Sequence, residues 1–200
     1  MGSYLYGRTQ FVRFNEVESS LFLFNSGVGQ GSKLGPLFFL VMINDLAEVV
    51  RNSTPSLFAD DMKLSMRVNS LADCGRLQED LDAIMSWSEA NRICFNVSKC
   101  CVATFSLNRA CHNFNYKMCS IVLDRRTEIK DLGVTFDTKL VFDVHINNVV
   151  KSSFRLLGYI KRTCRFFRSV DAIVRLFNTF IRAKLEYAYG TLFTRTKCCK

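Results

Sequence analysis

Two aspartates stand side by side in the stretch SLFADDMKL, between apolar residues that favour a β-strand. Asp60 and Asp61 repel each other when both are ionised, and oxygen ligands of this kind favour Mg²⁺ or Mn²⁺. Two metal ions about 4 Å apart promote phosphoryl transfer, but they need carboxylates from more than one strand. The pair therefore suggests part of a metal site. The alternative is a turn that contains two aspartates by chance, for which a chain of this length has about even odds.

A β-hairpin is the element that would present this pair. Apolar and polar residues alternate from Met62 to Val68, which predicts a half-buried second strand. The preceding SLF segment predicts the first strand. The aspartates would then lie at or near the turn.

The segment before the hairpin predicts two strands and a helix. The strands are expected in TQFVRF and SLFLFN, and a glycine-rich loop follows them. Pro36 suits the first position of a helix, and LFFLVMINDLAEVV carries apolar residues on nearly every face. We therefore expect a buried helix that ends before Pro55.

The segment after the hairpin predicts a capped helix and several short strands. Ser70 and Asp73 resemble a capping box, and apolar residues recur at helical spacing as far as Arg92. Short strands are expected in ICFNVS, CVATFSL, YKMCSIVL and IKDLGVTFD.

From about Thr138 the pattern becomes helical again, which places a soft boundary near Asp137. The first helix should carry one apolar face with Ile146, Val149, Val150, Phe154 and Leu157. The last, Val170 to Ala188, should turn Ile173, Val174, Phe177, Phe180 and Ile181 inward. Arg168, Arg175 and Arg182 are spaced by seven and should line one outer face of it.

Positive charge is concentrated in the last quarter of the chain. The 200 residues carry a net charge of +9, but residues 151–200 alone carry +10, which leaves the first 150 close to neutral. Such asymmetry indicates contact with a polyanion, nucleic acid or an anionic membrane surface. The alternative is a solvated basic face that aids solubility.

The nine cysteines and the apolar runs bear on location. No secretory signal precedes the cysteines, so reduced thiols in an intracellular protein, nuclear or cytoplasmic and not secreted, are expected. Cys100, Cys101, Cys111 and His112 lack a recognised zinc spacing. The longest apolar run, Leu37 to Ile43, is far shorter than the roughly 20 residues of a membrane span, so no membrane partner is expected.

The order of four segments resembles a known family. GVGQGSKLGPLFFLVMINDL, LFADDMKL, CFNVSKC and IKDLGVTFDTKL are similar to successive palm motifs of reverse transcriptases from non-long-terminal-repeat retrotransposons, especially jockey-like elements. The resemblance covers essentially the whole chain. It implies an α+β fold in which residues 1–137 form the C-terminal part of a palm, an antiparallel sheet with helices packed on one face. Residues 138–200 would form a basic, helical thumb-like region.

The resemblance also implies roles for individual residues, and with them an RNA-directed DNA polymerase that uses two Mg²⁺ or Mn²⁺ ions. Its partners would be an RNA template, a DNA primer and deoxynucleoside triphosphates. Asp60 and Asp61 match the metal-binding pair, and Lys99 matches a lysine that protonates departing pyrophosphate, although an ordinary surface lysine is the alternative. The template and nucleotide would contact Gly27, Gln30, Gly31 and Ser32, and the primer end would be supported by Leu132, Gly133 and Val134. The duplex backbone would be gripped by Lys161, Arg162, Arg165, Arg168, Arg175 and Arg182.

Two departures from the family pattern affect the expected activity. Glycine stands at position 29, where the family usually has proline, and this loosens the loop. The family's further metal-binding aspartate has no counterpart, since Glu16 and Glu18 lie in a polar turn without matching surroundings. We therefore expect the 200 residues to be inactive by themselves. The alternatives are a nucleic-acid-binding remnant without catalysis and a poorly folded pseudogene product.

Overall fold

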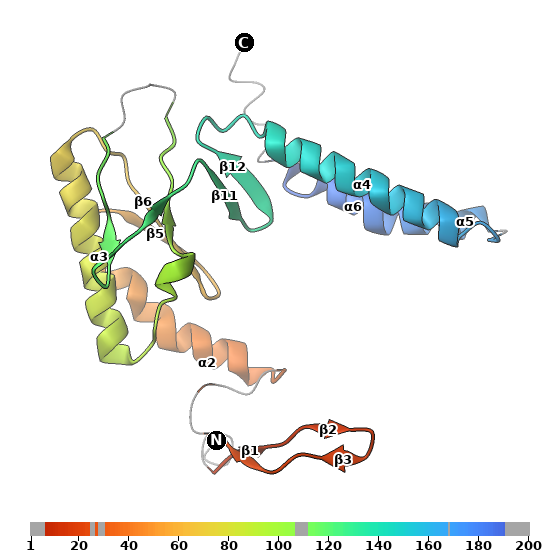
Figure 1. Cartoon of the computed structure of the whole chain (residues 1–200), viewed down its shortest axis with the longest axis horizontal. Helices are drawn as coiled ribbons and strands as arrows, with labels where there is room; N and C mark the ends of the chain where they lie inside the picture. The colour runs from red at the N-terminus through yellow and green to blue at the C-terminus, as the bar shows by residue number, and fades with distance from the viewer. Residues whose placement is uncertain (1–6, 25–26, 28–30, 107–111, 168, 191–200) are drawn as a thin grey trace. The chain divides into compact units, whose positions relative to one another are not determined.

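The structure, a computed structural model, describes residues 7–24, 27, 31–106, 112–167 and 169–190 (Figure 1). The chain divides into two compact units, residues 1–94 and 95–200, and each is described by itself. The boundary predicted near Asp137 is a different one, between a palm and a thumb-like region, and it stays a prediction.

Helices and strands are mixed along the chain, so the predicted α+β class is confirmed. Among the described residues the strands pair two at a time, in six two-stranded ladders. Five ladders are antiparallel, and β10 with β7 is parallel. The predicted antiparallel sheet is present among these residues as separate two-stranded ladders, because most of the strands are two residues long and end before a third strand can join.

The first unit begins with two short ladders. β1 (Thr9–Gln10) pairs with β4 (Phe22–Leu23), and β2 (Arg13–Phe14) pairs with β3 (Val17–Glu18). The predicted first strand is thus split in two. Asn15 and Glu16 both have positive φ in the turn between β2 and β3, which confirms that Glu16 lies in a turn. Glu18 was expected in the same turn, but it is the last residue of β3 and pairs with Arg13.

The helix predicted at Pro36 begins two residues earlier. α2 covers Leu34–Ile43 and continues as a 3₁₀ helix, η1 (Asn44–Val49). The expectation that it is buried was wrong: Val41 is 69% exposed, and only Gly35 and Ile43 of α2 are buried. A helix that is apolar all round needs cover on every side, and the described part of this unit covers one side.

The capped helix is confirmed. α3 (Leu71–Asn91) begins with a complete capping box in which Ser70 and Asp73 bond reciprocally. It packs on η1 and buries Cys74, Ile84 and Trp87. The hairpin formed by β5 (Thr54–Phe58) and β6 (Asp61–Ser65) belongs to the same unit.

Short elements open the second unit. A 3₁₀ turn, η2 (Val97–Lys99), replaces the strand predicted in ICFNVS, because its N–H groups bond to carbonyls three residues back. The two-residue strands that follow are β7 (Cys101–Val102), β8 (Lys117–Met118), β9 (Ile121–Val122) and β10 (Asp124–Arg125). The short strand predicted in IKDLGVTFD is a hairpin, in which β11 (Glu128–Asp131) pairs with β12 (Val134–Asp137).

Helices complete the second unit. α4 (Asp143–Thr163) lies beside a continuous helical segment made of α5 (Val170–Leu176), the π-helical turn η3 (Phe177–Arg182) and α6 (Ala183–Glu186) (Figure 1). Their shared core is Ile160, Cys164 and Ile181.

The predicted apolar faces of these helices were only partly right. Phe154 is 69% and Phe180 51% exposed, whereas Ile181 is buried as predicted. A π-helical turn holds more residues than an α-helical turn, so residues after η3 face a different direction from the one that α-helical spacing predicts. Arg175 and Arg182, seven residues apart, are therefore not aligned on one face of the helix. Arg168 lies outside the described residues. Over the described part of the chain no helix has the length and apolar character to cross a bilayer.

Candidate active site

The aspartate pair lies at the turn of the β5–β6 hairpin, as predicted (Figure 1). Phe58 pairs with Asp61 as the last step of the ladder, and Ala59 and Asp60 form the two-residue turn. Ala59 has a φ of +50°, which is unusual for a residue with a side chain and marks a constrained backbone just before the first aspartate. Both carboxylates are exposed, so their oxygens are accessible to a cation.

The carboxylates of Asp60 and Asp61 could supply some of the ligands of a hard divalent cation. Adjacent carboxylates suit Mg²⁺, which takes one or two protein carboxylates and fills its remaining positions with water and substrate phosphates. Among the described residues no group of three or more His, Cys, Asp or Glu side chains converges on one point. Asp60 and Asp61 therefore supply a pair of ligands, and a two-metal site would need further oxygen atoms.

A buried carboxylate holds the chain segment that precedes this hairpin. Asp80, on α3, is 2% exposed and accepts hydrogen bonds from the chain segment that leads into β5. Its Oδ2 accepts from the Ser53 N–H and hydroxyl, both at 2.7 Å, and its Oδ1 accepts from the Arg51 N–H at 3.0 Å. The Asn52 N–H adds a bond of 3.1 Å. One side chain thus satisfies three successive backbone donors ahead of Thr54.

Those bonds decide the ionisation of Asp80. Burial acts to raise the pKa of its carboxyl, but the hydrogen bonds from Ser53, Arg51 and Asn52 outweigh burial and keep the pKa below its ordinary value. Sequence reasoning missed this residue. The available signal was an aspartate in line with the apolar positions Leu77 and Ile84 on the inner face of an amphipathic helix.

The glycine-rich segment is described at three of its four predicted positions. Gly27 and Gly31 have φ values of +81° and +80°, which require glycine, and a Cβ at Gly31 would meet nothing within 4 Å. Ser32 Oγ accepts a hydrogen bond of 2.9 Å from the Gly35 N–H and so caps the start of α2. Gln30 lies outside the described residues.

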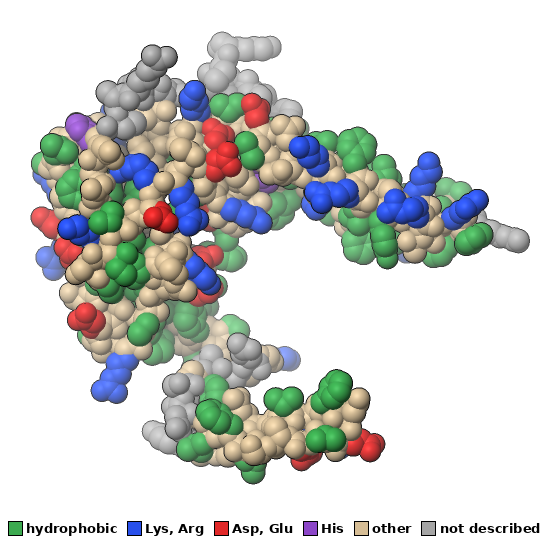
Figure 2. All heavy atoms as spheres, viewed as in Figure 1, with side chains coloured by type: hydrophobic (Ala, Val, Ile, Leu, Met, Phe, Trp, Pro, Cys, Tyr) green, Lys and Arg blue, Asp and Glu red, His purple; other side chains and the backbone are tan. Residues whose placement is uncertain are grey.

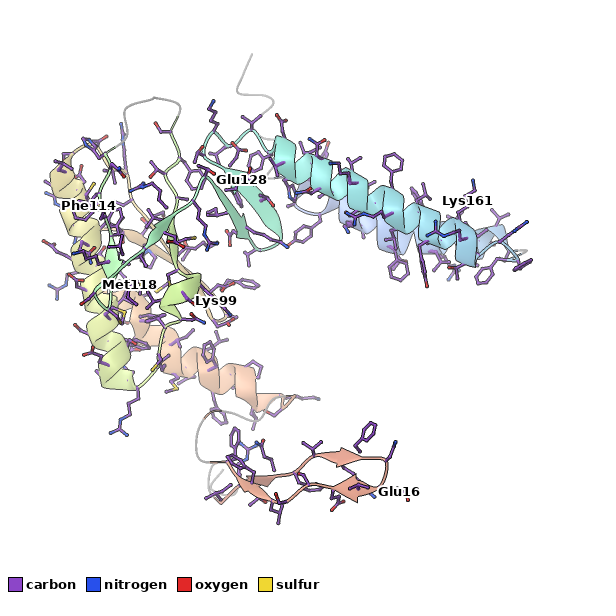
Figure 3. All side chains as sticks on the ribbon, viewed as in Figure 1. Glu16, Lys99, Phe114, Met118, Glu128 and Lys161 are labelled. Carbon is purple, nitrogen blue, oxygen red and sulfur yellow. The ribbon has the colours of Figure 1, made fainter. Side chains whose placement is uncertain are left out.

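Lys99 is the last residue of η2, with an exposed side chain (Figure 3). It belongs to the second unit, whereas the aspartate pair belongs to the first. The cysteines nearby remain thiols: Cys100 and Cys101 are free, and burial, assisted by the neighbouring Cys101, raises the pKa of the Cys100 thiol. Cys111 lies outside the described residues.

The predicted primer-support residues lie at the turn of the β11–β12 hairpin. Leu132 and Gly133 have φ values of +44° and +84°, which is the two-residue hairpin turn that favours glycine. Val134, the first residue of β12, is buried. Asp137 ends β12 and accepts bonds from the N–H groups of Lys139, Val141 and Phe142, which orders the chain before α4.

Most of the predicted backbone-binding residues are exposed on the helices. Lys161 and Arg162 lie in the last turn of α4, and Arg165 follows it (Figure 3). Figure 2 shows Lys and Arg side chains along this helical region, next to apolar ones. Arg182 is engaged already, because its Nε donates to Glu186 at 2.7 Å.

Comparison with known proteins gives one consistent result. Residues 2–160 match the family model described as reverse transcriptase (RNA-dependent DNA polymerase). The chain is 33% identical over 161 residues to the RNA-directed DNA polymerase from mobile element jockey of Drosophila melanogaster, a match that covers 76% of this chain and 17% of that protein. It is 27% identical over 168 residues to the probable RNA-directed DNA polymerase from transposon BS of the same species, covering 80% and 18%. No solved structure matches the chain.

The chain therefore spans less than a fifth of the length of the curated relatives it matches.

Proposed function

The chain belongs to the reverse transcriptase family, and we propose that it carries part of an active site for RNA-templated DNA synthesis. The observation that carries this proposal is the exposed Asp60–Asp61 pair at a constrained hairpin turn. The partners would be an RNA template, a DNA primer and deoxynucleoside triphosphates, and the protein would act in the nucleus or cytoplasm.

We assign Asp60 and Asp61 as ligands of Mg²⁺ or Mn²⁺, with two ions in the complete site. The ions would supply charge neutralisation for the attacking 3′-hydroxyl and the departing pyrophosphate. The residues of this chain would do the rest: Lys99 protonates the leaving group, and the backbone around Gly27, Gln30, Gly31 and Ser32 approaches the template and nucleotide. Leu132, Gly133 and Val134 would support the primer end.

In the same proposal residues 1–137 form part of a palm and residues 138–200 a thumb-like region. The exposed lysines and arginines of α4 to α6 would contact phosphates of the template–primer duplex without reading its sequence. The charge of +10 over residues 151–200 supports this assignment.

We further propose that the 200 residues do not catalyse synthesis by themselves. Within the described part of the chain the aspartate pair has no third acidic partner, and loss of one metal ligand removes several kcal/mol of transition-state stabilisation. Primer extension on an RNA template with Mg²⁺ or Mn²⁺ tests this point. Robust synthesis that Asp60→Ala abolishes would contradict it.

Metal binding tests the site independently of synthesis. Titration of Mn²⁺ followed by electron paramagnetic resonance should give a weaker site in Asp60→Asn and in Asp61→Asn, by about tenfold or more, because each change removes a charged ligand. Asp82→Asn, an exposed aspartate on α3, is the matched control. Equal affinity in all four proteins would rule out the pair as the metal site.

A second candidate function is nucleic-acid binding without catalysis, which the exposed basic residues of α4 and η3 favour. Binding of a duplex that weakens with salt and is unchanged by Asp60→Ala, in a protein that binds no Mn²⁺, would select this function.

A further inference from the structure

The turn of the β11–β12 hairpin is hydrogen-bonded to Tyr187, a residue distant in sequence. The Tyr187 hydroxyl donates a hydrogen bond of 2.7 Å to the Leu132 carbonyl, across 55 residues of sequence. The ring of Tyr187 also faces Gly133: a Cβ at Gly133 would lie 3.3 Å from its Cε1. The φ of +84° favours glycine at this position, and a side chain here would also press on the Tyr187 ring.

A second hydrogen bond joins β12 to α4. The Thr135 N–H donates to Nδ1 of His145 at 3.2 Å, and His145, on α4, is only 5% exposed. Thr135 pairs with Lys130, and this pair follows the Asp131–Val134 pair that closes the turn. In an antiparallel ladder the N–H groups of such a second pair point away from the partner strand. His145 therefore covers a donor on the free edge of β12.

Both bonds tie the hairpin to the basic helices. His145 comes from the first turns of α4, and Tyr187 directly follows α6. His145, Gly133 and Tyr187 also line one cavity of about 390 Å³, together with Lys184 of α6. The hairpin turn and the helices that carry the phosphate-binding residues are consequently joined in one unit, across the predicted boundary at Asp137.

We propose that Tyr187 is a positioning residue: it fixes the Leu132–Gly133 turn against the basic helices, so that the primer end and the duplex behind it are held in one register. This inference rests on the proposed function of the turn and helices. The hydroxyl is the essential group, because the ring alone fills space beside Gly133 but supplies no donor to the Leu132 carbonyl.

Hydrogen exchange tests the contact itself. Tyr187→Phe removes only the donor, and Tyr159→Phe makes the same change at an exposed tyrosine of α4. We expect exchange in peptides over residues 128–137 to rise roughly two- to tenfold in Tyr187→Phe, the range that one hydrogen bond supports, and to stay unchanged over α3. Equal exchange in the two variants would overturn the proposal.

Duplex binding tests the positioning role. The unmodified chain should prefer a duplex with a recessed primer 3′ end over a continuous duplex of equal length, measured by competition in fluorescence anisotropy. Tyr187→Phe should keep its affinity for the continuous duplex and lose the preference, whereas Tyr159→Phe should keep both. Faster exchange with an unchanged preference would reduce Tyr187 to a purely structural contact. Absence of any preference in the unmodified chain would refute primer support by the turn, and the exchange result would still decide whether the contact exists.

Discussion

At the scale of one residue, Asp80 shows how a buried carboxylate orders the chain that enters the hairpin of the aspartate pair. It organises residues 51–53, which enter β5, and thereby the hairpin of Asp60 and Asp61. Its three backbone bonds would all be lost on truncation. Buried donors left without a partner are costly, typically about 1–3 kcal/mol each before relaxation.

We therefore predict that Asp80→Ala lowers the free energy of unfolding of the first unit by about 3 kcal/mol. Urea titration followed by fluorescence measures it, since Trp87 is the only tryptophan and is buried on the same helix. Asp82→Ala is the control, because its side chain is exposed and accepts an exposed bond from Gln78, and it should cost under about 0.5 kcal/mol. Equal effects of the two changes would contradict the role given to Asp80.

The lowered pKa of Asp80 predicts a pH dependence with a defined sign. The unfolded-state pKa of an aspartate is about 3.9, and the folded value lies below it, so the carboxylate stabilises the fold fully above about pH 5. That contribution is lost as the pH falls below about 4 and through the folded pKa. The difference in unfolding free energy between the unmodified chain and Asp80→Asn should shrink over the same range. A difference that is constant between pH 7 and about pH 3 would argue against an ionised Asp80 in the fold.

The roles of single residues were predictable where they depend on residues close in sequence. The aspartate pair and the glycine turn at position 133 could be found from local motifs. The contacts of Asp80 and Tyr187 span 27 and 55 residues, and no local pattern marks which distant backbone group such a side chain will meet.

At the scale of elements, the same distinction separates the correct predictions from the wrong ones. The capping box of Ser70 and Asp73 and the β5–β6 and β11–β12 hairpins depend on short-range chemistry, and the structure has all three. Burial of α2 was wrong because it depends on what covers the helix. The strand expected in ICFNVS was wrong because three residues in 3₁₀ geometry satisfied the backbone locally.

The capping box gives a test of one element. Ser70→Ala removes the side-chain acceptor for the Asp73 N–H and should cost about 1 kcal/mol of stability. Ser86→Ala is a matched change inside the same helix, where the serine hydroxyl donates back to the Asp82 carbonyl. Alanine favours the helix interior, so this control should be within about 0.5 kcal/mol of the unmodified chain. Urea titration with Trp87 fluorescence compares the two, and an equal loss in both would show that the cap contributes nothing.

For the molecule as a whole, charge and motif order were more informative than predicted packing. The order of four motifs identified the family that the comparisons show, because it does not depend on how the strands assemble. The expected antiparallel sheet was not predictable in the same way. The strands of the described residues are short, and pairing beyond two strands depends on contacts that the sequence pattern does not specify.

The uneven charge leads to a prediction about duplex binding. Arg182 is already paired with Glu186, so if the other five proposed residues each neutralise one phosphate, log Kd should change with log salt concentration with a slope of magnitude about 4.5. Replacing Lys161, Arg162 and Arg165 by glutamine should reduce that magnitude by about 3 units and weaken binding equally for unrelated duplex sequences. The matched control replaces three exposed basic residues of the first unit, Arg67, Arg76 and Arg92, by glutamine.

The control has the same net charge as the helix variant, so it separates local contact from overall attraction. A general electrostatic attraction would give both triple variants the same slope, which would contradict a defined phosphate-binding face. Glu186→Gln adds a further distinction. It frees Arg182 from its 2.7 Å ion pair, so affinity at low salt should rise and the slope should steepen by up to about 1. An unchanged slope in Glu186→Gln would place Arg182 outside the binding face, whatever the other five residues do.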